Sequence, residues 1–302
     1  MEKQKMGIAR FFTGYLKNLH KILLTNILFA VPLAGFTALF FWLNSLLHPL
    51  FDMVLFLAVI FVYPFFAGVT AVTRNIARED EDVRVIKTYF SAIRDNLKYF
   101  IVHGVVLYFA IFFSYASLTY YWKMAQSNSV FLGVFIVTAI IVLAAVFVFY
   151  SVPVMTVTFD LSLKDIYKNS FLMSFGELKN NLLASLGLFL LALFCATIFI
   201  TVPSFTILLI TMAVLALLVI PATASFIINF YIFKDMMTMI GEEAEPSDTD
   251  DVISPSESVK LDFSSLDLDE KKDGEEYLFF NGKMIKRKVL KKMRDRQENE
   301  NE

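Results

Sequence analysis

Residues Glu81–Lys98 read EDVRVIKTYFSAIRDNLK and lie between two long apolar stretches. Apolar residues recur in this segment at spacings of three and four, which is typical of one helix face; they are Val83, Ile86, Phe90, Ile93 and Leu97. Charged residues fall on or near the other face, namely Arg84, Lys87, Arg94, Asp95 and Lys98. The pattern therefore predicts an amphipathic helix that connects two membrane spans.

Two interpretations of this helix are open. It lies flat on the bilayer surface, where Arg84, Lys87, Arg94 and Lys98 bind the membrane or a partner, or it is a solvated connector packed on its own protein. Four acids, residues 79–82, crowd its expected start, where the positive end of a helix dipole favours carboxylates. Because the dipole accounts for these acids, we expect no metal site there.

The composition is that of a membrane protein. The 302 residues are 57% hydrophobic and 16% aromatic, and the mean hydropathy is +0.61, above the range of soluble domains. The single cysteine, Cys195, lies in an apolar run and cannot form an internal disulfide. The first apolar run is longer than a signal-peptide core and lacks an A-x-A cleavage site, so we expect an uncleaved span.

Six apolar runs reach the roughly 20 residues needed to cross a hydrocarbon core of about 30 Å. They cover residues 22–47, 50–72, 99–122, 130–159, 182–202 and 205–233. The sequence therefore predicts an all-α, polytopic membrane domain over residues 1–236, with surface helices near 6–19, 81–98 and 162–180. Residues 237–302 form a cytoplasmic tail.

Lysine and arginine fix the expected orientation, because short cytoplasmic loops are enriched in both. The basic segments are the N-terminus and the loops that follow the second and fourth spans. The three loops on the other side carry only Lys123 between them. Both termini are therefore expected in the cytoplasm.

A weak internal repeat accompanies the surface segments. Leu16-Lys17, Leu97-Lys98 and Leu178-Lys179 each precede an outgoing span, and both intervals are 81 residues. Ser162-Leu163-Lys164-Asp165 is a capping-box pattern that predicts a helix start in the third segment. The spacing suggests three units, each a surface helix followed by a helical hairpin.

Two stretches resemble the YesL-like family of bacterial integral membrane proteins, whose shared domain has no assigned function. They are FFAGVTAVTRNIAREDEDVRVIKTYFSAIRDNLKYF at Phe65–Phe100 and TFDLSLKDIYKNSFLMSFGELKNNLL at Thr158–Leu183. The resemblance spans roughly Met6 to Phe233 and implies a multi-pass protein of the bacterial plasma membrane. Members often accompany carbohydrate-uptake or carbohydrate-degradation systems. The charged C-terminal tail departs from the compact members.

The sequence contains no recognisable catalytic or metal-binding motif. Ionisable residues inside spans are the usual sign of an ion path, and here His103 alone lies a turn inside one, as a proton sensor or as a hydrogen-bonded interfacial histidine. The three histidines lie apart, and neither a nucleophile motif nor a phosphate loop is present. We expect no enzyme, cofactor or metal. Polar and proline positions either line a pathway or pack helices; they are Asn26, Asn44, Asn229, Pro32, Pro64, Pro153 and Pro221.

The charge of the tail changes from negative to positive along its length. Residues Glu242–Glu276 are acidic and predict disorder. Asn281-Gly282 is a hairpin-turn signal, and the later spacing of Ile285, Val289 and Met293 predicts a basic amphipathic helix. Its candidate membrane-surface or partner-binding residues are Lys286, Arg287, Lys288, Lys291 and Lys292. Alternatively, the basic end pairs with the acidic half.

From these features we expect an accessory or regulatory component of a transport system, one for carbohydrate uptake in particular. The alternative is a self-sufficient permease or channel for a small neutral solute. The expected partners are the lipid bilayer and a transporter complex or cytoplasmic protein, with no nucleic acid. The sequence specifies neither a substrate nor an oligomeric state.

Overall fold

The computed structural model describes residues 7–46, 53–80, 83–243, 277–280, 283–287, 289–291 and 294. Its helices are α1 (Ile8–Lys17), α2 (Leu19–Leu46), α3 (Met53–Phe56), α4 (Ala58–Ala77), α5 (Val85–Ser127), α6 (Val130–Thr158), α7 (Leu163–Gly176), α8 (Leu178–Thr201), α9 (Phe205–Leu218) and α10 (Ile220–Glu243). Two strands follow, β1 (Tyr277–Phe280) and β2 (Lys283–Lys286). The chain separates into two compact units, one of residues 1–157 and 161–234 and one of residues 158–160 and 235–302.

The first unit is all-α and polytopic, as the sequence predicted. Five helical segments in the described residues are long and apolar enough to cross a membrane, and α9 with α10 adds a sixth if the bent pair is one span. That pair bends by 44°, at Val219, two residues before Pro221. The expected turn at His48-Pro49 lies outside the described residues.

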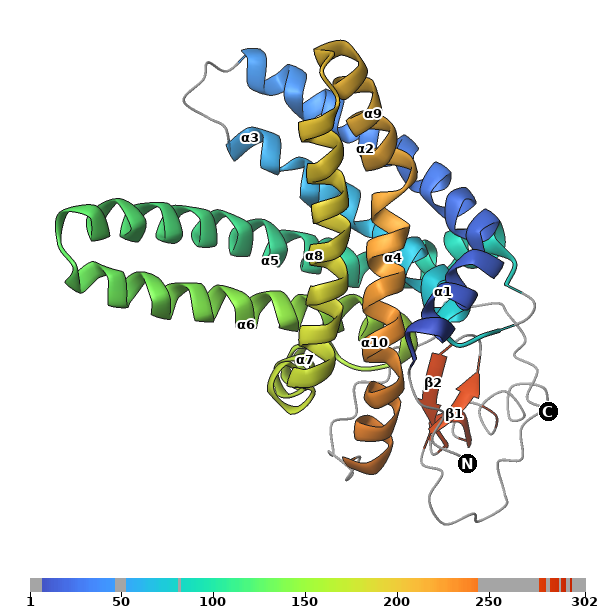
Figure 1. Ribbon diagram of the computed structural model, residues 1–302. Helices are drawn as coiled ribbons and strands as arrows, with labels where there is room; N and C mark the ends of the chain where they lie inside the picture. Colours follow the sequence, from blue (N-terminus) through green and yellow to red (C-terminus); the bar gives the residue numbers. More distant parts are fainter. Residues whose placement is uncertain are drawn as a thin grey trace. The chain divides into compact units, whose positions relative to one another are not determined.

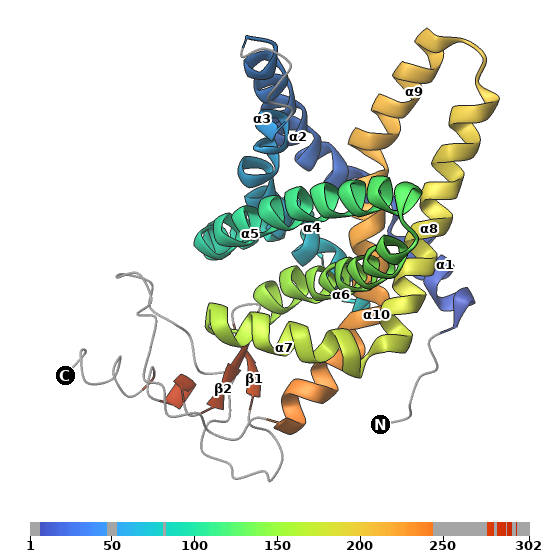
Figure 2. The same cartoon turned by 90° about the vertical axis from the view of Figure 1, so that its left-hand side faces the viewer.

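Three helical hairpins diverge from a shared base in the first unit (Figures 1 and 2). They consist of α2 with α3 and α4, α5 with α6, and α8 with α9. The base holds the main hydrophobic core, which includes Val69 and Val72 of α4, Tyr89 of α5 and Phe226 of α10. The outer parts of the hairpins expose large apolar side chains, as expected of surfaces that face lipid.

Helix α5 differs from the predicted surface helix in its start and its length. It begins at Val85 and has no acid in its first turn, so the expected carboxylate-rich start is wrong. Instead, Glu79 adopts a left-handed backbone (φ 64°) and helps to end α4. The helix then runs for 43 residues without the expected break near Tyr99, because no glycine or proline interrupts it there. At 1.5 Å per residue it is about 65 Å long, roughly twice the hydrocarbon core.

The face of α5 that packs on the protein is also not the predicted stripe. The buried side chains near its start are those of Val85, Tyr89, Ala92 and Asn96. The predicted apolar stripe is divided: Val83 and Ile93 pack against the core, whereas its other members face outward. Three of its members are 43–57% exposed; they are Ile86, Phe90 and Leu97. The helix therefore has a packed face, an outward apolar face and a charged face.

Two glycines allow α5 to approach α4 closely. A Cβ on Gly68 would overlap the ring of Tyr89, and a Cβ on Gly104 would lie 3.2 Å from the backbone of Ile60. The bulk of Tyr89 is thus accommodated only because position 68 lacks a side chain. This contact fixes the rotation of α5, and hence which of its faces is buried.

The other surface helices agree better with the sequence. Ser162 caps α7, since its hydroxyl accepts a hydrogen bond from the Asp165 N–H at 3.2 Å, which confirms the predicted helix start. Helix α7 ends at Gly176, and α8 begins at Leu178. Helix α1 ends at Lys17, and the side-chain amide of its C-cap residue, Asn18, donates to the Gly14 carbonyl at 3.0 Å. A break in the helix therefore separates α1 from α2 and α7 from α8. The second surface helix has no such break and continues into its span as α5.

Burial supports the proposed repeat. Ile22, His103 and Ala184 follow one another at intervals of 81 residues, and all three are fully buried. Three further pairs of residues, each 81 positions apart, are also buried at both positions. Val85, Tyr89 and Ala92 of α5 are buried, as are their counterparts 81 residues later, Ile166, Ser170 and Met173 of α7. The three leucines that marked the repeat are all exposed, at 43–62%; they are Leu16, Leu97 and Leu178.

The second unit contains a short antiparallel sheet. Strands β1 and β2 pair in register from Phe280↔Lys283 to Tyr277↔Lys286, as expected for a two-residue turn at 281–282, which lies outside the described residues. Ile285 pairs with Leu278, so the helix predicted from the spacing of Ile285, Val289 and Met293 is wrong at Ile285. The cross-strand pairing with apolar residues 277–280 overrides the helical spacing. Helical residues occur after the strand, at 287, 289–291 and 294.

Candidate functional site

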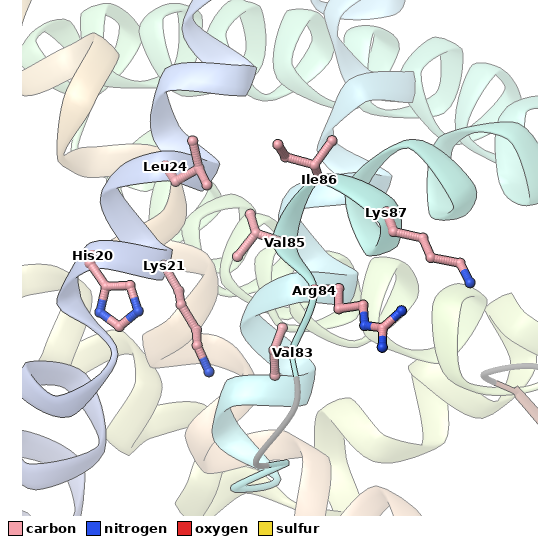
Figure 3. Close-up of a pocket in the computed structure, with 8 residues that line it drawn as sticks. All are labelled: His20, Lys21, Leu24, Val83, Arg84, Val85, Ile86 and Lys87. Carbon is pink, nitrogen blue, oxygen red and sulfur yellow. The ribbon is translucent and has the colours of Figure 1, made fainter.

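A basic groove lies between the start of α2 and the start of α5 (Figure 3). It encloses about 550 Å³ and is lined by His20, Lys21 and Leu24 of α2 and by residues 83–87. In Figure 3 the side chains of Leu24, Val85 and Ile86 lie along the gap between the two chain segments. The polar ends of His20 and Lys21 lie on the α2 side, and those of Arg84 and Lys87 extend from the other segment in the direction away from α2. The groove is therefore lined by apolar side chains and has polar or basic side chains on both sides.

Of the four acids that precede the groove residues 83–87, Glu81 and Asp82 lie outside the described residues, and the other two are engaged elsewhere. Glu79 pairs with Arg10 at 2.7 Å, and Asp80 lies 3.8 Å from Arg78. Among the described residues, no carboxylate lies within ion-pair distance of Arg84 or Lys87. Arg84 is also the N-cap residue of α5 and provides no side-chain cap. The positive end of a long helix therefore adds to the positive charge of the groove.

Two of the predicted basic residues of α5 lie in the groove, and two do not. Arg84 and Lys87 line it. Arg94 is 86% exposed and lies 3.5 Å from Asp95, and Lys98 is exposed farther along the helix. The sequence pattern missed His20 as a site residue and treated Lys21 only as a loop charge, since nothing in a linear pattern places α2 beside α5.

The predicted basic residues of the tail belong to the second unit. Lys286 is the last residue of β2, Arg287 is partly exposed and Lys291 is exposed. Lys288 and Lys292 lie outside the described residues. The described part of this cluster therefore consists of a strand end followed by helical residues, each with a basic side chain.

A hydrogen-bonded triad connects α5, α6 and α7. The ring of His103 is fully buried; its Nδ1 lies 2.9 Å from the Tyr167 hydroxyl and its Nε2 lies 3.0 Å from the Thr156 hydroxyl. Thr156 donates its own proton to the Val152 carbonyl at 2.7 Å. Its oxygen must therefore accept from Nε2–H, which leaves Nδ1 to accept from Tyr167.

This arrangement suits a neutral imidazole and a neutral phenol. Burial raises the pKa of the Tyr167 hydroxyl to about 12, so the donor keeps its proton at physiological pH. Both ring nitrogens of His103 and both hydroxyls are used within the protein. Of the two roles expected for His103, the structure provides the hydrogen-bonded one.

A second buried network joins α4 to α10. The Thr73 and Ser225 hydroxyls lie 2.8 Å apart, and the Asn229 amide donates to Thr73 Oγ1 at 3.1 Å and to the Ser225 carbonyl at 2.9 Å. Asn26 of α2 spans the bend before α10, since its amide donates to the Val219 carbonyl at 3.2 Å and its oxygen accepts from the Ala222 N–H at 2.8 Å. Asn26 and Asn229 thus hold helices together.

Arg74 is placed differently from the sequence expectation. The sequence assigns it to the basic loop after the second span, but the structure buries it in α4 at 3% exposure. Its guanidinium donates to the Val157 carbonyl near the end of α6 and to the Asn75 side chain. The negative end of the α6 dipole favours a cation at this position. Arg74 therefore connects α4 to α6.

Across the part of the chain that the structure describes, no group of three or more His, Cys, Asp or Glu side chains could hold a metal ion. Cys195 lies half-buried in α8. The ligand chemistry that the described surface offers is instead that of the basic groove, which suits an anion attached to an apolar group.

The long apolar helices and the buried hydrogen-bonded networks define an all-α, polytopic membrane protein. Residues 22–118 match the model of a family described as a protein of unknown function, DUF624. This match covers most of α2, all of α3 and α4, and most of α5, and it includes the groove residues other than His20 and Lys21. Searches of the curated proteins and of the solved structures gave no match.

Proposed function

We propose that the protein is a non-enzymatic, multi-pass protein of the bacterial plasma membrane that assists or regulates a transport system. Both termini lie in the cytoplasm in this proposal, in keeping with the distribution of Lys and Arg. The resemblance to the YesL-like family supports a link to carbohydrate uptake. The partner would be a transporter complex or a cytoplasmic protein attached to one.

The observation that carries this proposal is the internal pairing of the buried polar groups. Ion-coupled transport generally uses charged side chains at depth in the membrane. Arg74 and His103 are buried, but no Asp, Glu or Lys is buried among the described residues. His103, Thr73 and Asn229 bond to neighbouring helices and brace the base of the hairpins.

The outward apolar face at the start of α5 supports a role at the membrane surface. Ile86 and Phe90 are more than half exposed although the helix is packed on α4 by another face. A solvated connector would bury Ile86 and Phe90 on its own protein, as Val83 and Ile93 are packed. The exposed stripe, flanked by basic residues, fits a helix lying at the bilayer surface, where it is accessible to a cytoplasmic partner.

One observation favours the alternative of a permease for a small neutral solute. The side-chain oxygens of Asn96, Asn181, Asn229 and Ser151 are buried and have no hydrogen-bond partner among the described residues. Such oxygens are acceptors for the hydroxyl groups of a polyol. We therefore retain transport of a neutral solute as the second candidate.

The two candidates are separated by comparing cells with purified protein. For an accessory protein, deleting the gene slows uptake by the host's carbohydrate systems, and the affinity-tagged chain co-purifies with components of one of them. The purified chain in liposomes, compared with empty liposomes, then takes up no sugar. Saturable uptake by the chain alone, reduced by Asn229→Leu, would overturn the accessory role and support the permease.

A further inference from the structure

We propose that the C-terminal β-hairpin is a latch that closes on the connection between α6 and α7. Strand β2 pairs with this connection at residues 158–160, which belong to the same compact unit as the tail. Phe159 forms a parallel β-bridge with Met284, and the Asp160 N–H donates to the Met284 carbonyl at 3.3 Å. The proposal concerns a conformational device and does not depend on the proposed role in transport.

The register of the hairpin directs one edge of β2 towards the connection. Across a two-residue turn, Phe280 and Lys283 form the hydrogen-bonded pair that closes the hairpin, and the pair types alternate from there. The next pair, Phe279 and Met284, is therefore a non-hydrogen-bonded one. Both the N–H and the carbonyl of Met284 point away from β1, and the carbonyl meets Asp160. The connection thus joins the open edge of β2, as in β-strand addition.

Folding of the hairpin and its docking support each other. A hairpin of two short strands is at best marginally stable by itself in water. Phe159 is 3% exposed, and Leu290, which follows β2, is fully buried. Both side chains belong to the unit that holds the hairpin, so their burial favours the docked arrangement. The hairpin and the connection therefore become ordered together.

In the proposed orientation, the connection and the tail lie on the same side of the membrane. Residues 158–160 follow the fourth predicted span, and the tail follows the sixth. The distribution of Lys and Arg favours a cytoplasmic location for both. Strand β2 therefore reaches the connection without crossing the bilayer.

The latch acts on the start of α7. The Thr156 hydroxyl accepts from the His103 ring, which ties the end of α6 to α5. The Val157 carbonyl accepts from Arg74 of α4. On the other side of the connection, Ser162 caps α7. A docked hairpin holds the connection between these two fixed points, whereas an undocked hairpin leaves the connection and the first turn of α7 free to open.

Crosslinking of the full-length chain in mild detergent tests the pairing. In a Cys195→Ser background, Asp160→Cys with Ile285→Cys places two thiols one position beyond the bridge on neighbouring segments, within reach of a disulfide. The control combines Asp160→Cys with Leu278→Cys, since Leu278 lies opposite Ile285 on β1. Two strand spacings, about 10 Å, then separate the cysteines, which is too far for a disulfide. We expect peptide mapping after oxidation to find the first crosslink at least about tenfold more often than the second.

A second experiment releases the hairpin from the connection without unpairing its strands. Met284→Pro replaces the N–H that faces the connection with the bulk of the proline ring and costs β1 no hydrogen bond. Met284→Ala keeps the N–H and is the matched control. We expect Met284→Pro to speed hydrogen exchange of residues 160–168 at least about tenfold, because this segment then opens locally. Met284→Ala should exchange like the unsubstituted chain.

Three results would overturn the proposal. Equal crosslinking of the two cysteine pairs would show that β2 does not lie beside the connection. A disulfide recovered only in dimers, on a gel run without reductant, would make the hairpin of a second copy the occupant. Equal exchange of residues 160–168 in the two Met284 variants would show that the hairpin does not restrain α7.

Discussion

At the residue scale, a partly buried tyrosine and a fully buried one illustrate how similar side chains have different consequences. Tyr167 donates to His103 and thereby joins α7 to α5. Tyr89 is 1% exposed, and its hydroxyl has no hydrogen-bond partner among the described residues. An unsatisfied buried hydroxyl opposes folding, whereas a satisfied one contributes about 1 kcal/mol.

We predict opposite effects of removing these two hydroxyls. Tyr167→Phe should lower the free energy of unfolding by about 1–3 kcal/mol, because it leaves His103 Nδ1 without a donor. Tyr89→Phe should leave stability unchanged or raise it, since it removes a hydroxyl but retains the packed ring. Thermal unfolding of the purified variants checks both, and equal losses would contradict the assigned hydrogen bonds.

The contact between Gly68 and Tyr89 gives a second prediction. Gly68→Ala should destabilise the protein by about 1–3 kcal/mol, because the added methyl group overlaps the Tyr89 ring and α4 and α5 must separate. Gly35→Ala is the matched control, since nothing lies within 4 Å of a Cβ at that position of α2. If the two alanine variants unfold at the same temperature, the close approach of α4 and α5 is not as described.

At the element scale, α5 shows what the sequence could and could not predict. The helix itself and its apolar stripe follow from the spacing of residues 83–97. Its packed face does not, because Tyr89, Ala92 and Asn96 are only weakly apolar as a group and Gly68 of α4 selects them. In contrast, the start of α7 follows directly from the local chemistry of Ser162 and Asp165. The local capping signal of α7 was predicted correctly, and the face of α5 that tertiary contacts select was not.

The outward stripe of α5 predicts distinct environments for neighbouring residues. In a chain with Cys195→Ser, a fluorophore attached to Phe90→Cys should be quenched by brominated lipid, because residue 90 faces the bilayer in the surface-helix interpretation. A fluorophore at Ser91→Cys, one position around the helix, should respond mainly to a water-soluble quencher. Water-soluble quenching of both labels to the same extent would favour the solvated connector.

The tail gives a second prediction at this scale. A peptide of residues 277–296 carries a dense set of basic side chains and should bind anionic vesicles at low salt, with binding that falls steeply as salt rises. Attaching residues 242–276 should weaken binding, because its carboxylates compete for the same cations. A peptide that does not bind anionic vesicles would point to a role in docking soluble proteins.

At the scale of the whole molecule, the all-α polytopic class with five or six apolar helices was predictable, whereas the groove was not. Each span can be recognised from the length of its own apolar run. The 81-residue interval links positions that are all buried in the structure, such as Ile22, His103 and Ala184. The groove requires knowing that Lys21 lies beside Arg84, which is set by packing of the first hairpin on α5. Arg74 was misplaced for the same reason, since its partner Val157 comes from a helix far away in the sequence.

The orientation of the spans is a prediction at this scale. Reporter fusions at Pro49, Gln126 and Ser204 should report an external location, and fusions at Asp80, Asp165 and Asp250 an internal one. The reason is the alternation of Lys and Arg between successive loops. A single reproducible inversion at any of the six sites would contradict the six-span arrangement with both termini inside.

The pairing of the first helices with the last ones has a consequence for biosynthesis. Tyr15 contacts Thr223 at 2.9 Å, and Asn26 bonds to the backbone of Val219 and Ala222, across about 200 residues of chain. A ribosome adding about 5–20 residues per second needs roughly 10–40 s to supply those partners. During that interval the Asn26 amide of the nascent chain needs water or an insertion factor as a substitute. A chain that stalls before Ile220 therefore presents an unsatisfied amide in the membrane, a feature by which quality-control proteases can recognise an orphan fragment.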